Sequence, residues 1–100
     1  EDAFEKKYAH DAELRFKAEA RRNKLLGLWA AGLLGKRGTD ADTYVSDLIA
    51  ADFEQAGDED VFRKIRRDFD AAKVAQSDHQ IRRTMDEMLQ KAIDQVRGES

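Results

Sequence analysis

Residues 25–34 read LLGLWAAGLL, and this stretch decides the fold. A helix that is apolar on every face is typical of a protein core, so we expect these residues to be buried. Each glycine inside a helix costs roughly 1 kcal/mol relative to alanine. We therefore expect Gly27 and Gly32 to serve a close approach by another helix.

Glycines and capping residues divide the surrounding chain into helices. Gly35 predicts the end of a first helix that begins at about Asp2. Thr39 and Asp40 are both suitable caps for a second helix, which we expect to end at Gly57.

A third and a fourth helix follow. Asp58 is the predicted cap of the third, while Ser77 and Gln80 form a capping box that begins the fourth, which stops at Gly98. The apolar residues of the last three helices recur at three-and-four spacing, which predicts one buried face on each. These residues are Tyr44, Val45, Leu48, Ile49 and Phe53, then Val61, Phe62, Ile65 and Phe69, then Ile81, Met85, Met88, Leu89, Ala92, Ile93 and Val96.

The composition excludes several classes of protein. The chain has 100 residues, which is one small domain, and 39% of them are charged, so most helix faces must be solvated. The net charge of -3 argues against nucleic acid as a partner, and the lack of cysteine excludes disulfides. No apolar stretch approaches the ~20 residues of a membrane span, so we expect a cytoplasmic protein without direct membrane insertion. Because the chain starts at Glu1 and not at methionine, we expect native residues before it.

We expect no enzymatic activity, no metal site and no cofactor. No serine lies in a motif that activates a nucleophile, and His10 and His79 are far apart with no cysteine nearby. One basic cluster leaves two interpretations open, a solvated face with local ion pairs or a weak adenine-nucleotide site. It consists of Arg63, Lys64, Arg66 and Arg67.

The first ~20 residues do not match the pattern of the other helices. Pairs such as Asp11 with Arg15 and Glu13 with Lys17 favour a helix by ~0.2–0.5 kcal/mol each, which gives a partial helix in water. We therefore expect a segment that becomes ordered in the groove of another protein. The alternative is that it extends the first helix and folds back on the bundle. Its apolar stripe is sparse, with one residue every four positions: Phe4, Tyr8, Ala12, Phe16 and Ala20.

The expected fold class is all-α, a four-helix bundle with a mobile or partly helical N-terminal segment. The chain also resembles a known family, the zeta subunit of alphaproteobacterial F-type ATP synthases. The resemblance covers nearly the whole chain and is weakest at residues 38–45 and 66–80. The blocks that carry it are residues 4–11 (FEKKYAHD), 18–30 (AEARRNKLLGLWA) and 51–64 (ADFEQAGDEDVFRK).

The resemblance implies an inhibitory subunit that blocks ATP hydrolysis and largely spares synthesis. Its N-terminal helix would enter a catalytic interface between the alpha and beta subunits, near the gamma subunit. The protein would then be peripheral to the inner membrane through the ATP synthase complex, and we expect a monomer when it is free. The alternative function is a small nucleotide-sensing helical module that binds ATP or ADP weakly.

Carried over by position, the resemblance divides the chain into an inhibitory segment, residues 1–19, and a four-helix bundle, residues 20–100. The bundle would dock on the outside of the enzyme head. We expect the contacts with the partner to be made by Phe4, Tyr8, Asp11, Leu14, Arg15 and Phe16.

Overall fold

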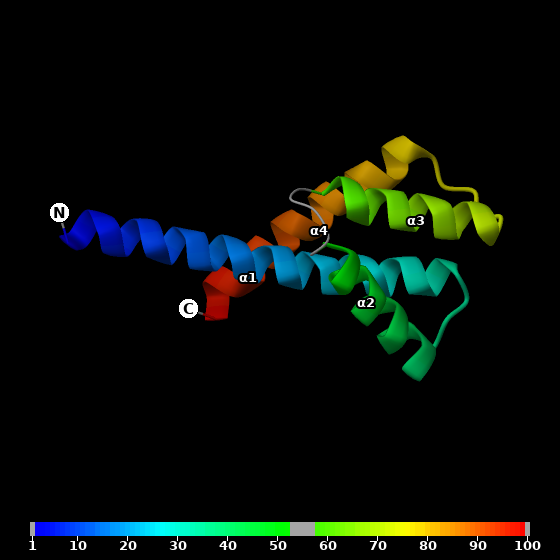
Figure 1. Cartoon of the computed structure of the whole chain (residues 1–100), viewed down its shortest axis with the longest axis horizontal. Coiled ribbons are helices and arrows are strands. Elements are labelled where there is room, and N and C mark those ends of the chain that lie inside the picture. The colour runs from blue at the N-terminus through cyan, green and yellow to red at the C-terminus, as the bar shows by residue number, and fades with distance from the viewer. Residues whose placement is uncertain (1, 53–57, 100) are drawn as a thin grey trace.

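The computed structural model describes residues 2–52 and 58–99, with side chains for residues 12–51 and 58–99. These residues form four helices and no strand. Helix α1 packs against α2 and α4, and α3 also packs against both of them (Figure 1). The predicted all-α four-helix bundle is confirmed. The helices are α1 (Asp2–Leu33), α2 (Thr39–Asp52), α3 (Glu59–Ala71) and α4 (Asp78–Glu99).

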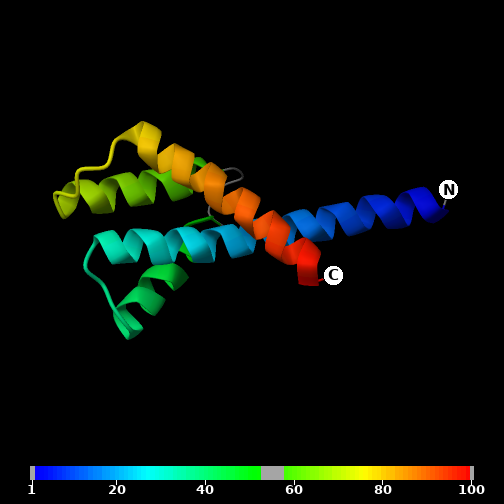
Figure 2. The ribbon, with the colours of Figure 1, turned by 180° about the vertical axis from the view of Figure 1, so that it is seen from behind.

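The molecule is elongated because α1 is much longer than the other helices. Its principal extents are 53 × 25 × 22 Å, and α1 has 32 residues, which at 1.5 Å per residue span about 48 Å. The first part of α1 continues past the end of α4, as both views of the ribbon show (Figures 1 and 2). The N-terminal segment is therefore helical and continuous with the helix that enters the bundle.

The main core lies among the four helices. The predicted apolar faces of α2, α3 and α4 supply most of it. All predicted residues of α3 are buried, whereas Val45 and Ile49 of α2 and Met88, Leu89 and Ile93 of α4 are half-buried, and Phe53 lies outside the described residues. Trp29 of α1 packs edge-on against Phe69 of α3, with ring centroids 5.6 Å apart. The buried members are Leu26, Ala30, Ala31, Tyr44, Leu48, Val61, Phe62, Ile65, Phe69, Ile81 and Met85.

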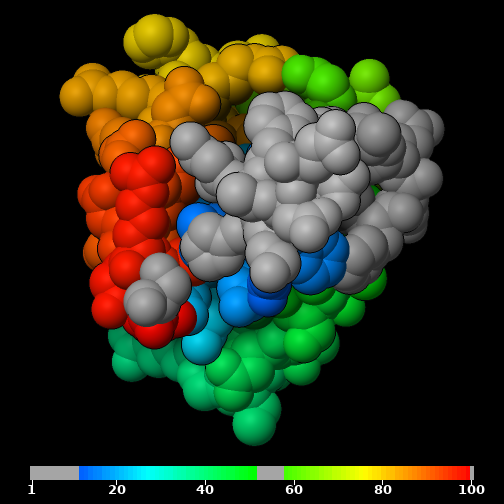
Figure 3. All heavy atoms as spheres, turned by 90° about the vertical axis from the view of Figure 1, so that its left-hand side faces the viewer, coloured from blue at the N-terminus to red at the C-terminus, as the bar shows by residue number. Residues whose placement is uncertain are grey.

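A second, smaller cluster holds α1 on the last turns of α4. Its buried side chains are Ala18, Ala92 and Val96, and Leu14 packs against them as a half-buried neighbour. Figure 3 looks at this end of the molecule and shows the end of α4 next to α1. Among the described side chains, Leu14 and Ala18 of α1 thus pack on α4, although both belong to the expected segment 1–19.

Residues 25–34 are less buried than their composition predicts. Leu28 is 45% exposed and Leu33 is 41% exposed, although Leu26, Ala30 and Ala31 are buried. The prediction that the whole stretch lies inside the core is wrong. The physical reason is that the main neighbours of α1 are α2 and α4, with Trp29 also touching Phe69 of α3, which leaves part of the circumference of α1 in water.

The two glycines of this stretch differ in their surroundings. A Cβ atom built on Gly27 would lie 3.0 Å from Cγ2 and 3.2 Å from Cα of Val45, so α2 approaches α1 closely at this point. The same atom built on Gly32 would meet nothing within 4 Å. The predicted close approach is confirmed at Gly27 and wrong at Gly32.

Two predicted helix ends have the expected geometry. Gly35 has a φ of 76°, and the Lys36 N–H donates to the Ala31 carbonyl at 2.9 Å, so a left-handed glycine ends α1. At the start of α4 the Gln80 N–H donates to Ser77 Oγ at 3.1 Å, and the Ser77 N–H donates to Gln80 Oε1 at 2.8 Å. Both predictions rest on local rules and both are confirmed.

Other helix ends differ from the prediction. Asp58 occupies the cap position of α3, but its side chain makes no capping hydrogen bond. It accepts a hydrogen bond from Arg22 Nη2 instead, at 2.9 Å, so the predicted cap position is confirmed but its carboxylate does not cap the helix. Helix α4 continues to Glu99, beyond the predicted stop at Gly98. The predicted end of the second helix at Gly57 lies outside the described residues.

Candidate functional site: the end of the bundle from which α1 projects

The expected partner-binding residues occupy the part of α1 that leaves the bundle. Phe16 is 63% exposed, and the side chain of Arg15 is 83% exposed. Leu14 points in a different direction and packs against the small cluster on α4. The structure thus places two of these side chains on open surface and one against the bundle. The side chains of the others lie outside the described residues: Phe4, Tyr8 and Asp11.

Ion pairs within α1 run along this exposed part. Lys17 Nζ lies 3.2 Å from Glu13 Oε1, which confirms the predicted pair. Arg15 Nε donates to Glu19 Oε1 at 3.2 Å, a partner that we did not predict. Exposed pairs at this spacing contribute ~0.3–0.5 kcal/mol each, so they support the helix where it leaves α4.

Arg21 holds α1 to the C-terminal end of α4. Its Nη1 and Nη2 donate to the two carboxylate oxygens of Glu99, at 2.6 and 2.9 Å. Nη1 also donates to Gln95 Oε1 at 3.2 Å. The hydrogen bond from Arg21 lowers the pKa of Glu99, against a smaller opposite effect of desolvation. This bidentate contact joins helices that are far apart in the sequence.

Arg22, the next residue, holds α1 to the start of α3. It is only 1% exposed, although guanidinium groups are rarely buried without compensation. Its Nε donates to Asn23 Oδ1 at 2.7 Å and its Nη2 donates to Asp58 Oδ1 at 2.9 Å. Nothing in the sequence near Arg22 predicted this burial, because its partner comes from a distant helix.

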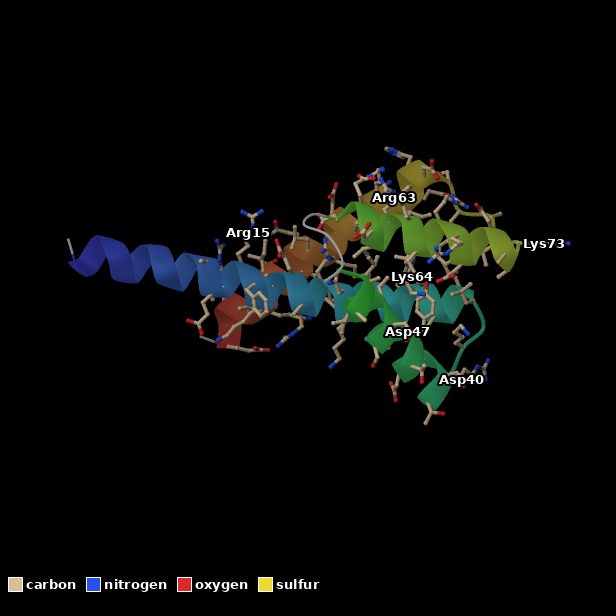
Figure 4. The ribbon with its side chains drawn as sticks, viewed as in Figure 1. Arg15, Asp40, Asp47, Arg63, Lys64 and Lys73 are labelled. Atoms are coloured by element: carbon tan, nitrogen blue, oxygen red, sulfur yellow. The ribbon has the colours of Figure 1, made fainter. Side chains whose placement is uncertain are left out.

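A groove of about 500 Å³ lies between α1 and α4 at the same end of the bundle. Figure 4 shows Arg15 reaching outward from α1 at this end. The apolar lining of the groove comes from Leu14, Ala18, Leu89, Ile93 and Val96. Its charged lining comes from Arg15, Glu19, Arg22, Asp58 and Arg97.

The basic cluster on α3 is partly used in ion pairs. Lys64 Nζ donates to Asp68 Oδ2 at 3.1 Å, one turn along the same helix. Arg66 Nη2 lies 2.7 Å from Asp70 Oδ1, and Arg66 Nη1 lies 3.0 Å from Asp78 Oδ1, so this side chain joins α3 to the start of α4. These contacts occupy two of the four cations of the cluster.

The other two cations of the cluster lie apart from these pairs. The side chain of Arg63 is 66% exposed, with its Nη1 3.8 Å from Asp60 Oδ1, and Arg67 is exposed as well. Figure 4 shows Arg63 and Lys64 on different sides of α3. The structure therefore does not bring the four cations together at one anion site.

Residues 2–52 and 58–99 lack two other kinds of site. No group of three or more His, Cys, Asp or Glu residues in this part of the chain could hold a metal ion. No helix there has the length and apolar character that crossing a membrane requires.

Comparison with known proteins places the chain in one family. The family model for ATPase inhibitor subunit zeta matches residues 1–95. No curated protein matches the chain. A structure determined by NMR in solution is 42% identical to it, with a TM-score of 0.75, and the match covers 87% of this chain and 99% of that chain. Because the family model spans nearly the whole sequence, the chain belongs to the ATPase inhibitor subunit zeta family.

Proposed function

We propose that this protein inhibits ATP hydrolysis by F-type ATP synthase, and that it does so by inserting residues 1–19 into a catalytic interface between the alpha and beta subunits. Membership of the inhibitor family supports the inhibitory role. The insertion is supported by one observation above all. Phe16 is 63% exposed on a helix that continues beyond the bundle, so a large aromatic side chain is available to a partner.

The physical basis of inhibition is preferential binding to one conformation of the enzyme. A catalytic interface must open and close as the gamma subunit turns, and a helix wedged in it stabilises the state that it fits. Full burial of Phe16 in the interface would contribute roughly 1.5–3 kcal/mol. The exposed guanidinium of Arg15 can pair with a carboxylate of the partner in the same interface.

The rest of the proposed assembly follows from this insertion. Phe4, Tyr8 and Asp11 would lie deeper in the interface, towards gamma, and Leu14 would remain between the segment and α4. Residues 20–100 would stay outside, docked on the enzyme head. The protein would then be cytoplasmic and held at the inner membrane by the ATP synthase.

The test is a Phe16→Ala variant of the full chain, added to inverted bacterial membranes that hydrolyse ATP. We expect the concentration for half-inhibition to rise by about tenfold or more, because the anchor is lost. Wild-type chain should leave ATP synthesis largely intact in the same membranes. Leu28→Ala is the matched control, since Leu28 is an apolar residue of α1 that is 45% exposed but lies inside the bundle region.

The melting temperature of Phe16→Ala should stay close to that of the wild type, since this side chain is 63% exposed, whereas Leu28→Ala should lower it by a few degrees because Leu28 is about half buried. Equal inhibition by Phe16→Ala and wild type would show that Phe16 is not an anchor. A failure of the wild-type chain to inhibit hydrolysis would remove the proposed function altogether.

A further inference from the structure

The part of α1 that leaves the bundle has two opposite faces. Leu14 and Ala18 pack on α4, and Ala18 is only 2% exposed. Phe16 lies two positions from each of them, and residues two apart in an α-helix point in directions about 160° apart. Phe16 is accordingly 63% exposed. One face of this part of α1 is therefore open to a partner, whereas α4 covers the opposite face.

Two kinds of contact hold the end of α4 on α1. The apolar cluster buries Ala92 and Val96 of α4 completely or nearly so. Arg21 of α1 donates to both carboxylate oxygens of Glu99, at 2.6 and 2.9 Å. A bidentate ion pair of this kind fixes orientation as well as distance. We therefore expect α4 to remain on α1 when a partner binds.

The first part of α1 extends farther than α4 does. Both views of the ribbon show α1 continuing beyond the end of α4, and Figure 3 shows that end beside α1 (Figures 1 and 2). Ala12 and Glu13 are exposed, and Leu14 is the first described side chain that packs on α4. Residues 2–13 of α1 span about 18 Å, at ~1.5 Å per residue.

An interface that encloses one helix is too narrow for two packed helices. A helix with its side chains is about 10–12 Å wide, and a second helix packed on it has its axis about 8–10 Å away. The enzyme could therefore surround α1 up to Glu13. From Leu14 onwards it would meet α4 on one side of the inserting helix.

We propose that the C-terminal end of α4 sets how far α1 enters ATP synthase, by abutting the rim of the interface between an alpha and a beta subunit. The stop acts only if the helix inserts, so this inference rests on the proposed function. Residues 2–13 would be enclosed by the enzyme, and residues 14–19 would lie at the mouth of the interface. Phe16 would face the enzyme there while Leu14 stays on α4.

A fixed depth gives the inserted side chains one register. A helix that slid deeper by one turn would move each of its side chains by about 5.4 Å, which is enough to take an anchor out of its pocket. With α4 against the rim, Phe4 and Tyr8 would always stop at the same distance from gamma.

The first experiment lengthens α4 at its C-terminal end. Seven residues of alanine, glutamate and lysine are added after Ser100, together with Gly98→Ala, whose new methyl group meets nothing within 4 Å. The added turns lengthen α4 by about 10 Å and leave about 8 Å of α1 beyond it. The control chain carries Gly98→Ala and seven residues of glycine and serine, which stay flexible.

The two extended chains should inhibit ATP hydrolysis differently. We expect the helical extension to raise the concentration for half-inhibition about tenfold or more, because Tyr8 no longer reaches its place. The flexible extension should stay within about twofold of Gly98→Ala alone, since it can move aside. Circular dichroism of the free chains checks that only the first extension adds helix. Equal half-inhibitory concentrations for the two extended chains would overturn the proposal.

The second experiment tests whether α4 stays on α1 in the inhibited complex. The chain has no cysteine, so Arg21→Cys with Glu99→Cys gives one pair of thiols that a short bismaleimide can link. We expect the linked chain to inhibit at least as strongly as the same variant without the linker. Loss of inhibition on linking would mean that α1 must leave α4 in order to bind, which contradicts the stop.

The third experiment looks for the rim itself. Gly98→Cys places a thiol on the exposed end of α4, where a photoreactive maleimide can be attached. In the inhibited complex it should cross-link to an alpha or a beta subunit. The absence of such cross-links in a fully inhibited complex would show that the end of α4 does not touch the enzyme.

The outcomes separate the stop from the proposed function. If the wild-type chain inhibits nothing, both are wrong. If the wild type inhibits and Phe16→Ala inhibits about tenfold less well, while the two extended chains remain equal, the insertion stands and the stop is wrong.

Discussion

The close contact between α1 and α2 predicts opposite effects for two substitutions in the same helix. Gly27→Ala places a methyl group 3.0 Å from Cγ2 of Val45 and 3.2 Å from its Cα. Gly32→Ala places the same group where nothing lies within 4 Å. The two variants share the chemical change and the helix, so they differ only in the packing around the new atom.

The expected magnitudes follow from two opposing effects. Alanine is better than glycine in a helix by roughly 1 kcal/mol, and both variants gain about this amount. At Gly27 the crowding of a backbone atom of α2 costs about 1–3 kcal/mol, because a packed helix must move to relieve it. The free energy of unfolding should therefore fall by about 0–2 kcal/mol for Gly27→Ala and rise by about 1 kcal/mol for Gly32→Ala.

The assay is thermal unfolding followed by circular dichroism. For a chain of this size 1 kcal/mol shifts the melting temperature by ~4–8 °C, so the two variants should move in opposite directions from the wild type. The fluorescence of Trp29, the only tryptophan, reports the core in the same samples. If Gly27→Ala raises the melting temperature as much as Gly32→Ala does, α2 does not pack as closely on α1 at Gly27 as these distances indicate.

Four further substitutions test other parts of the fold. Lys73 has a φ of 59°, so Lys73→Gly should stabilise the chain by about 0.5–1 kcal/mol, and unchanged stability would mean that the left-handed turn is not strained. Ser77→Ala removes half of the capping box and should cost about 1 kcal/mol in chemical unfolding, whereas Ser77→Asp keeps the cap and should cost little. Asp58→Asn leaves the buried guanidinium of Arg22 without its counter-ion and should cost about 1–2 kcal/mol, less than for a fully buried pair because Asp58 is half exposed. Folding lowers the pKa of Glu99, so the ionised carboxylate stabilises the protein above its unfolded pKa of ~4.3, and this stabilisation is lost as the pH falls through the lower folded pKa. The melting temperature of Glu99→Gln should therefore fall less steeply between pH 5 and pH 3 than that of the wild type. Parallel curves for the two proteins would contradict this.

Local rules predicted the parts of the fold that depend on neighbours in sequence. Gly35 ends α1 because only its own backbone angle and the preceding turn matter there. Ser77 and Gln80 cap α4 because both partners lie within one turn. The apolar faces of α3 and α4 were also predictable, since a period of 3.6 residues already places them on one side.

Long-range contacts caused the errors. Asp58 has the ideal residue type for a cap, but Arg22 competes for its carboxylate from another helix. Gly27 and Gly32 are alike in sequence, and only the position of α2 separates them. Lys73 gave no signal, because lysine rarely adopts the left-handed conformation that follows α3.

The sequence predicted which segment forms the candidate site, but it did not predict how α1 is attached to α4 there. The sparse stripe and the family resemblance pointed to the first part of α1, and Phe16 is indeed exposed. The spacing could not reveal that Leu14 turns towards α4, since this depends on the crossing of two distant helices. The groove was invisible for the same reason.

The attachment of α1 bears on how strongly the segment can bind. Arg21 and Arg22 fasten the helix to the end of α4 and to the start of α3, so the bundle sets the direction in which α1 projects. Ordering a disordered segment on binding costs ~2–5 kcal/mol, and this cost is smaller for a segment that continues a fixed helix, because fewer of its residues must be ordered. The ion pairs of Glu13 and Arg15 act in the same sense, because they support the turns just before the fastened region. In the proposed insertion the bundle would contribute to affinity even where it does not touch the enzyme, and loosening the two arginine contacts should weaken inhibition while all the anchors remain in place.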